Sequence, residues 1–150
     1  CDMLIRGDLR ALFFEVERDH ADKAIVCVKH DFRPAETVKM DAQIQSVYSR
    51  KNWSSFCFFN AEHPANRALT LDLINERPGR DLHAFCWLDG EDQIGALPIA
   101  WNWLAGHSDP AIEPANVHWT DGIPLLPGYE DAPYAGEFRE TMSDWAERGS

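Results

Sequence analysis

Two short apolar runs constrain the fold of this chain more than any other feature. Residues 23–28 read Lys-Ala-Ile-Val-Cys-Val, and residues 53–59 end in Phe-Cys-Phe-Phe. A strand without alternating apolar and polar residues is covered on both faces, as in sheets that carry helices on either side. The two runs therefore predict an α/β fold with buried strands.

Helices are predicted where a capping residue precedes apolar residues three and four positions apart. Asp8, Thr70 and Asp81 are the expected N-caps, the last for a helix extending to Leu88. A final helix is predicted for residues 134–148, and further strands for residues 101–104 and 115–119. The apolar face of the final helix consists of Tyr134, Phe138, Met142 and Trp145. Because no repeat or linker interrupts this order, residues 1–150 are expected to form a single domain.

The charge balance limits the ligands that such a chain can bind. It has 14 basic and 25 acidic residues, a formal net charge of −11, and no block of lysines or arginines. Nucleic acid is therefore not expected as a partner, because phosphate contacts need clustered positive charge. A phosphorylated ligand would need a divalent cation between itself and the protein.

Cysteine usage and hydropathy bear on the compartment. Cys1, Cys27, Cys57 and Cys86 contain no CxxC pair, and the last three stand among apolar neighbours. They are expected to be buried free thiols in a reducing cytoplasm. No run of eighteen apolar residues is present to span a membrane. Peripheral contact with a membrane and the oligomeric state stay open.

Polar residues near strand ends are the candidates for chemistry. An acidic turn with Asp92-Gln93 precedes Trp101-Asn102, and Asp2 and His118 each stand at a strand end. Carboxylate oxygens with one imidazole suit Mn²⁺ or Mg²⁺ better than zinc. Taken alone, a histidine at a strand end such as His118 is more often a hydrogen-bonded structural residue, and turn aspartates usually serve the turn.

Residues 29–51 form a long polar stretch around Pro34. Loops of this length inside a compact domain are usually functional lids or binding segments. A solvated surface loop is the alternative, and the sequence leaves both open.

Four segments, read in order, resemble the second half of a GT-A-fold nucleotide-sugar glycosyltransferase, most closely the family 8 type. The resemblance covers roughly residues 1–125. The first segment is Cys1-Asp2-Met3, which resembles the end of a DxD strand, and the second is Trp53 to Asn60, which resembles a turn opening an apolar strand. The third is Asp92-Gln93 with Leu97-Pro98 and Trp101-Asn102. The fourth is His118-Trp119-Thr120 with Gly122 and Pro124.

The resemblance implies a partial GT-A fold, a mixed sheet flanked by helices, and the C-terminal part of a retaining, hexosyltransferase-like enzyme. It implies that Asp2, as the second aspartate of DxD, and His118 hold Mn²⁺ (or Mg²⁺) against the pyrophosphate of a nucleotide-sugar donor. Asp92 and Gln93 would lie beside the transferred sugar, which passes to a carbohydrate or glycoconjugate acceptor. The implied substrate-binding residues are Trp53, Ser54, Asn60, Trp101, Asn102 and Gly122.

The chain departs from the family pattern at three places. The first aspartate of DxD would fall one position before Cys1, Ile123 stands where the family has a phosphate-binding lysine, and Asn52 to Ser55 replace a Phe-Asn-Ala-Gly turn. Two rival functions follow. One is a non-catalytic domain that binds carbohydrate or protein through its tryptophans without a metal, and the other is a metal-dependent hydrolase acting on a phosphorylated sugar.

Overall fold

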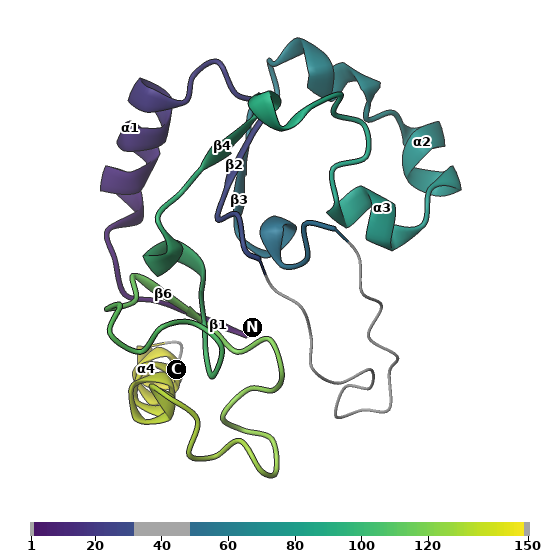
Figure 1. Cartoon of the computed structure of the whole chain (residues 1–150). Helices are drawn as coiled ribbons and strands as arrows, with labels where there is room; N and C mark the ends of the chain where they lie inside the picture. The colour runs from purple at the N-terminus through teal and green to yellow at the C-terminus, as the bar shows by residue number, and fades with distance from the viewer. Residues whose placement is uncertain (1, 32–48, 149–150) are drawn as a thin grey trace.

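The computed structural model describes residues 2–31 and 49–148. It is a mixed α/β structure with two separate three-stranded sheets, in the orders β1-β6-β5 and β3-β2-β4. In Figure 1 the second sheet lies in the upper half with α1, α2 and α3, whereas α4 and both chain ends lie in the lower half with the first sheet. The strands are β1 (Met3–Ile5), β2 (Ile25–Cys27), β3 (Cys57–Phe59), β4 (Ile94–Ala96), β5 (Trp103–Leu104) and β6 (Asn116–His118). The α-helices are α1 (Leu9–Asp19), α2 (Leu71–Glu76), α3 (Gly79–His83) and α4 (Ala135–Arg148).

The lower sheet joins the first strand of the chain to two strands from its last third. β6 is its central strand, antiparallel to β1 with Met3 opposite His118, and parallel to β5. Backbone pairing continues beyond the strands, because Trp119 N–H donates to the Asp2 carbonyl over 2.9 Å. Asp2 and His118 are therefore neighbours, although 115 other residues separate them in the sequence.

The upper sheet has β2 at its centre, antiparallel to β3 and parallel to β4. All residues of β2 are buried, which confirms that the first apolar run is a strand covered on both faces. The second run was expected to form a buried strand as well, and this was wrong. Residues 53–55 form a 3₁₀ turn, and the strand that follows lies at the sheet edge, so that Cys57 and Phe59 are exposed.

The predicted N-caps Asp8 and Thr70 are confirmed. Asp8 Oδ1 accepts from Arg10 N–H and Ala11 N–H, and Thr70 Oγ1 accepts from Leu73 N–H. The predicted helix from Asp81 to Leu88 is wrong. α3 begins at Gly79, after Pro78, and ends at His83, and Phe85 has a φ of 56° that no helix continues through.

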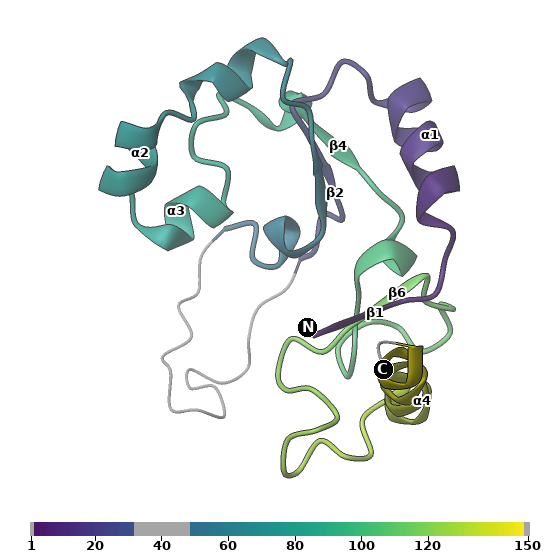
Figure 2. The same ribbon diagram turned by 180° about the vertical axis from the view of Figure 1, so that it is seen from behind.

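The C-terminal helix α4 uses only half of its predicted apolar face. Phe138 packs edge-on against Trp119, with ring centroids 5.0 Å apart. Met142 and Trp145 are exposed, Trp145 to 77%. The first half of α4 therefore covers the lower sheet, as Figures 1 and 2 show from opposite sides. Among the described residues, no helix is both long and apolar enough to cross a membrane.

Three apolar clusters hold these elements together. One lies between the upper sheet and the chain after α3, one lies between that sheet and α1, and one joins the lower sheet to α4. Trp53 belongs to the first cluster, Trp101 packs against the second, and Trp103 and Trp119 belong to the third. Trp87 also packs against the first cluster, so five of the six tryptophans contribute to packing.

The cysteines differ in exposure. Cys27, Cys57 and Cys86 are free thiols, but only Cys27 is buried, so the expectation of burial was wrong for the other two. Cys1 lies outside the described residues. Burial raises the pKa of the Cys27 thiol to about 12. Although the residue Cys57 is exposed, neighbouring atoms shield its sulfur from water and raise the pKa of this thiol as well, and its Sγ lies 4.0 Å from the Ser54 carbonyl oxygen.

Thiol alkylation is expected to follow this order. Because only the thiolate reacts, the raised pKa of Cys27 leaves it protonated at pH 8, and we expect iodoacetamide to modify Cys86 first and Cys27 only after unfolding. Peptide mass spectrometry over a time course measures the order. Modification of Cys27 in the native protein as fast as Cys86 would contradict the described packing around β2.

Candidate functional site

Two residues named as metal ligands from the sequence meet at the open side of the lower sheet. Asp2 Oδ2 lies 3.4 Å from His118 Nε2. The His118 ring is buried, whereas the Asp2 side chain is 56% exposed. The antiparallel register of β1 and β6 makes this contact. The buried imidazole of His118 and the exposed carboxylate of Asp2 therefore face each other at the protein surface.

The buried side chain of Asn102 fixes the orientation of His118. Asn102 Nδ2 donates to the Asn52 carbonyl over 3.1 Å and to Ser55 Oγ over 2.9 Å. Its Oδ1 is therefore the acceptor toward His118 Nδ1, 3.0 Å away, and Nδ1 carries the proton. In the neutral ring, Nε2 is then the unprotonated nitrogen, and this is the atom that faces Asp2.

This arrangement fits a divalent cation. A histidine that ligates a metal usually donates its other ring N–H to an oxygen acceptor, as His118 does to Asn102. Two cis ligands of a small divalent cation lie about 3 Å apart, close to the separation of Asp2 and His118. No group of three acidic, histidine or cysteine side chains that could hold a metal is found among the described residues. Mg²⁺-type sites commonly use one or two protein ligands, with water and substrate phosphates completing the shell.

His30 lies on the other side of Asn102. The pKa of His30 is lowered to about 4, chiefly by burial and also by the neighbouring His118 ring, while an interaction with the Asn102 backbone opposes the shift. A backbone bond that raises a histidine pKa is one donated to the carbonyl oxygen. His30 Nε2 is buried and has no hydrogen-bond partner in the part of the chain that the structure describes. The lowered pKa keeps the buried His30 ring neutral at pH 7.

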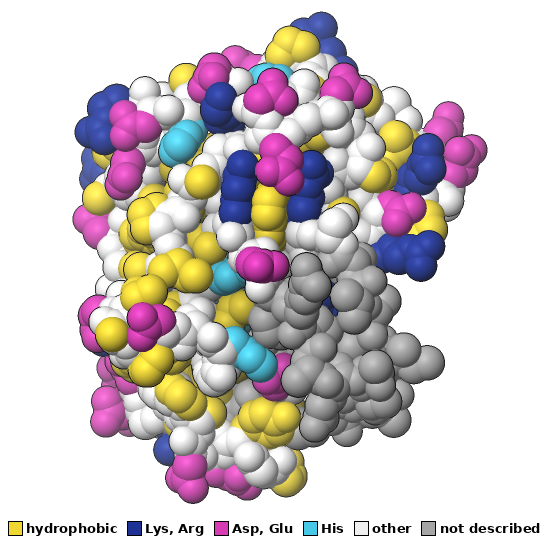
Figure 3. All heavy atoms as spheres, in the orientation of Figure 1, with side chains coloured by type: hydrophobic (Ala, Val, Ile, Leu, Met, Phe, Trp, Pro, Cys, Tyr) yellow, Lys and Arg dark blue, Asp and Glu magenta, His cyan; other side chains and the backbone are white. Residues whose placement is uncertain are grey.

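The buried Trp53 ring contacts both His30 and two cationic side chains. Its Nε1–H donates to the His30 carbonyl over 2.8 Å. Lys29 and Arg50 each lie over the Trp53 ring, 5.6 and 5.7 Å from its centroid. Arg50 Nε lies 4.0 Å from the Glu91 carboxylate, which brings the acidic turn beside this group. On the face seen in Figure 3, Lys and Arg side chains flank a hydrophobic one, and histidine side chains lie below it near the middle of the molecule.

The predicted catalytic pair Asp92 and Gln93 lies on the 3₁₀ turn Glu91–Gln93. Asp92 is exposed, and Gln93 Oε1 accepts from Asp89 N–H over 3.2 Å. No described contact joins either residue to Asp2 or His118. The turn that carries them is joined to Trp53 indirectly, because Glu91 lies near Arg50 and Arg50 lies over the Trp53 ring. The catalytic role of Asp92 and Gln93 stays a prediction.

The predicted substrate-binding residues have structural partners as well. Ser54 Oγ bonds His83 Nδ1 over 2.8 Å, and Asn60 Nδ2 donates to the Ala21 and Lys23 carbonyls. Trp101 stacks on Phe56 with an interplanar angle of 6°. Asn102 is 0% exposed and reaches the site only through His118. These contacts explain the residue types without a ligand, and substrate binding by them stays a prediction.

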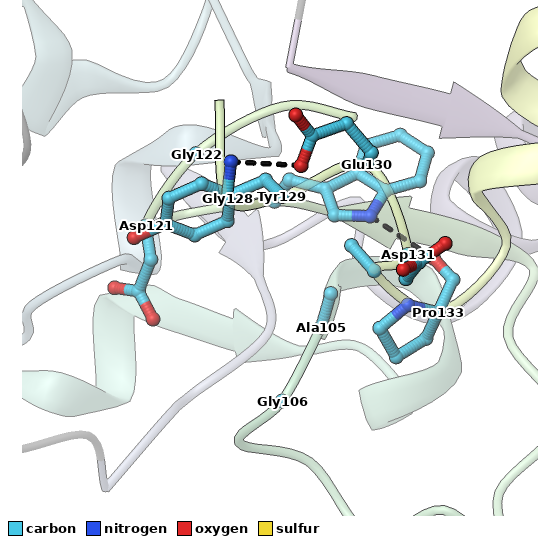
Figure 4. A pocket seen from close by; sticks show the side chains of 11 residues that line it. Ala105, Gly106, Asp121, Gly122, Gly128, Tyr129, Glu130, Asp131 and Pro133 are labelled. Carbon is cyan, nitrogen blue, oxygen red and sulfur yellow. Dashed lines mark hydrogen bonds between the residues drawn. The ribbon is translucent and has the colours of Figure 1, made fainter. Parts of the chain in front are cut away.

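Gly122 lines a pocket of about 470 Å³ formed by the loops after β5 and β6. A Cβ at Gly122 would lie 3.0 Å from the Tyr129 ring, so glycine lets this ring pack against the loop. Figure 4 shows Tyr129 among the acidic side chains Asp121, Glu130 and Asp131. Asp121 also bonds His107 Nε2 over 2.5 Å. The pocket wall is therefore acidic and aromatic.

Comparison with known proteins gives one relative to report. The chain is 39% identical to a curated protein of Arabidopsis thaliana named "Protein CDI" over an alignment 150 residues long, which covers 97% of this chain. The chain spans 56% of the length of that relative. No family model matches the sequence. No solved structure matches it either.

Sequence reasoning missed His30 and the Asn52–Ser55 contacts of Asn102. A signal for His30 was present, because a polar residue two positions after a buried strand commonly lies at a functional sheet edge. No local signal identified the partners of Asn102, which lie 47 and 50 positions away in the sequence.

Proposed function

We propose that this chain forms the metal-holding and sugar-side part of a metal-dependent glycosyltransferase, which transfers a sugar from a nucleoside-diphosphate sugar to a carbohydrate or glycoconjugate acceptor. The observation that carries the proposal is the Asp2–His118 pair, in which Asn102 bonds Nδ1 of the ring and Nε2 faces the Asp2 carboxylate. The family resemblance named both residues as ligands, and the pairing of β1 with β6 makes them neighbours although they are far apart in the sequence. A GT-A arrangement, retention of configuration and a cytoplasmic location are part of the same proposal.

The chain's own residues would act by position and charge. Asp2 and His118 would hold Mn²⁺ or Mg²⁺, which when bound would neutralise charge on the departing diphosphate. Asn102 keeps the His118 ring in the ligating tautomer. The cations Lys29 and Arg50, fixed over Trp53, provide local positive charge in a chain whose net charge is −11. The turn with Asp92 and Gln93 lies beside them and would accept hydrogen bonds from sugar hydroxyls.

Asp2→Asn is expected to weaken Mn²⁺-dependent binding of a nucleoside diphosphate by more than about tenfold, because the neutral amide replaces an anionic ligand. The carboxylate is largely exposed, so the melting temperature should move by less than about 2 °C. Titration calorimetry with UDP, GDP and ADP, with and without Mn²⁺, measures this on the protein from its complete reading frame. Asp22→Asn, an exposed acid paired with Lys23, is the matched control and should bind normally.

His118→Ala tests the second ligand. It should also abolish metal-dependent binding, although loss of the bond to Asn102 will cost stability as well. If the wild-type protein binds no nucleoside diphosphate in a Mn²⁺-dependent way, the transferase proposal fails. Sugar binding without any metal dependence would instead favour the non-catalytic binding domain. Hydrolysis of a phosphorylated sugar without an acceptor would favour the hydrolase.

A further inference from the structure

Two of the three cysteines that the structure describes lie opposite each other in the upper sheet. The antiparallel register of β2 and β3, which lie side by side in Figure 1, pairs Cys27 with Cys57. Both are free thiols; Cys27 is buried on the central strand, and Cys57 is exposed on the edge strand. Side chains of directly opposed residues point to the same face of a sheet, so the two thiols share one face.

The hydrogen bonds of β2 set the spacing of this pair. The Cys27 carbonyl accepts from Leu97 N–H over 2.9 Å, on the β4 side, whereas the Ala24 carbonyl accepts from Asn60 N–H over 3.0 Å, on the β3 side. Because backbone groups alternate in direction along a strand, Cys27 and Cys57 are a non-hydrogen-bonded pair, whose Cα atoms lie about 4.5 Å apart. Disulfides join Cα atoms about 4.4–6.8 Å apart, so this pair can be bridged.

The packing around the pair agrees with this placement. Cys27 belongs to the apolar cluster between the upper sheet and the chain after α3. Phe59, two positions after Cys57 and therefore on the same face, contacts Trp87, which packs against that cluster. The pKa of the Cys27 thiol is raised first by burial and next by the Cys57 thiol, which requires the two sulfurs to be near each other. Both thiols therefore lie on the side of the sheet that faces this cluster.

We propose that Cys27 and Cys57 form a reversible disulfide that joins β2 to β3, by exchange with a small-molecule disulfide such as oxidised glutathione. The Cys57 thiolate attacks one sulfur of the small disulfide, breaks its S–S bond and releases one thiolate. The Cys27 thiolate then attacks the Cys57 sulfur, forms the new S–S bond and releases the second thiolate. The small disulfide takes up the two electrons, and the two cysteine protons pass to the two released thiolates.

The geometry suits a reversible bond rather than a permanent one. The Cα spacing of a non-hydrogen-bonded pair is at the short end of the range for disulfides, and strained disulfides are more easily reduced. The bond would also tie together two segments that contact Asn102. β2 leads to His30, which interacts with the Asn102 backbone, and β3 follows Asn52 and Ser55, which accept from the Asn102 side chain. The proposal requires neither a metal nor a sugar, so it does not rest on the proposed function.

The test incubates the native protein, made from its complete reading frame, with oxidised glutathione at pH 8.5, because the raised pKa of both thiols slows exchange at lower pH. Unreacted thiols are then blocked with N-ethylmaleimide in denaturant, and the protein is digested with trypsin. Cleavage after lysine and arginine places Cys27 in residues 24–29 and Cys57 in residues 52–67. We expect non-reducing mass spectrometry to show these two peptides joined, and dithiothreitol to separate them.

Three variants assign the bond to this pair. Cys57→Ser removes the exposed attacking thiol and should leave Cys27 reduced. Cys27→Ala removes the second thiol and should leave glutathione attached to Cys57. Cys86→Ser is the matched control, because it removes another exposed cysteine and should form the joined peptides as fast as the wild type. Circular dichroism checks that each variant is folded.

Four results would overturn the proposal. One is complete modification of Cys86 by glutathione without any joined peptides. Another is a lasting mixed disulfide on Cys57 of the wild type, since Cys27 would then not reach it. A bond from Cys57 to Cys86 would contradict the register argument. So would joined peptides that form only in urea, because the folded sheet would then not be responsible.

Discussion

Asn102→Ala is expected to lower the free energy of unfolding by about 3–5 kcal/mol, because it leaves several buried partners unpaired at about 1–3 kcal/mol each. His118 Nδ1 loses its acceptor, and the Asn52 carbonyl and Ser55 Oγ lose their donor. Guanidinium denaturation followed by circular dichroism measures the change. A loss below about 1 kcal/mol would mean that these groups find water or new partners.

The chain contains a matched control for this variant. Asn66 is also buried, donates to the Ala24 and Asn60 carbonyls, and accepts from Trp87 Nε1–H. Asn66→Ala should therefore cost a similar free energy of unfolding. Only Asn102→Ala should also release the His118 ring, which ¹⁵N signals of the imidazole would report as a mixture of tautomers. Release of His118 in both variants would mean that general loosening, and not the Asn102 bond, is responsible.

Trp53→Ala is expected to lower the free energy of unfolding by about 3–5 kcal/mol, the usual cost of deleting a buried tryptophan. Trp53 is 7% exposed, packs in the cluster around β2 and β4, and donates to the His30 carbonyl. Lys29 and Arg50 would also lose the ring that they cover. Chemical denaturation measures the loss, and a change below about 1 kcal/mol would contradict the described packing.

Trp53→Phe separates packing from the hydrogen bond. The smaller ring keeps much of the apolar contact but cannot donate to His30, so we expect a loss of about 1–3 kcal/mol. The family pattern implies that Trp53 also contacts a sugar. In that case Trp53→Phe should bind a glycoside more weakly than another variant that has lost the same free energy of unfolding. Unchanged affinity would assign Trp53 a structural role alone.

The strands and caps that sequence predicted correctly are those decided by local chemistry. Asp8 and Thr70 accept from nearby backbone N–H groups, and this needs only the residues that follow. The run around Val26 is apolar on both faces and is buried on both. The run ending at Phe59 has a similar composition but lies at a sheet edge, because edge or centre depends on which strands arrive later in the chain. The predicted loop of residues 29–51 lies mostly outside the described residues.

The sequence by itself determined the α/β class, the caps Asp8 and Thr70 and the acidic charge balance, and it offered Asp2 and His118 as candidate ligands. Only the tertiary structure decided that these two meet 3.4 Å apart, since the register of β1 against β6 sets their separation. It also decided that Asn102 is a buried support of His118 and that His30 is buried, with its Nε2 lacking a hydrogen-bond partner among the described residues. Burial and hydrogen-bond partners depend on chain segments far apart in the sequence, and no local pattern encodes them.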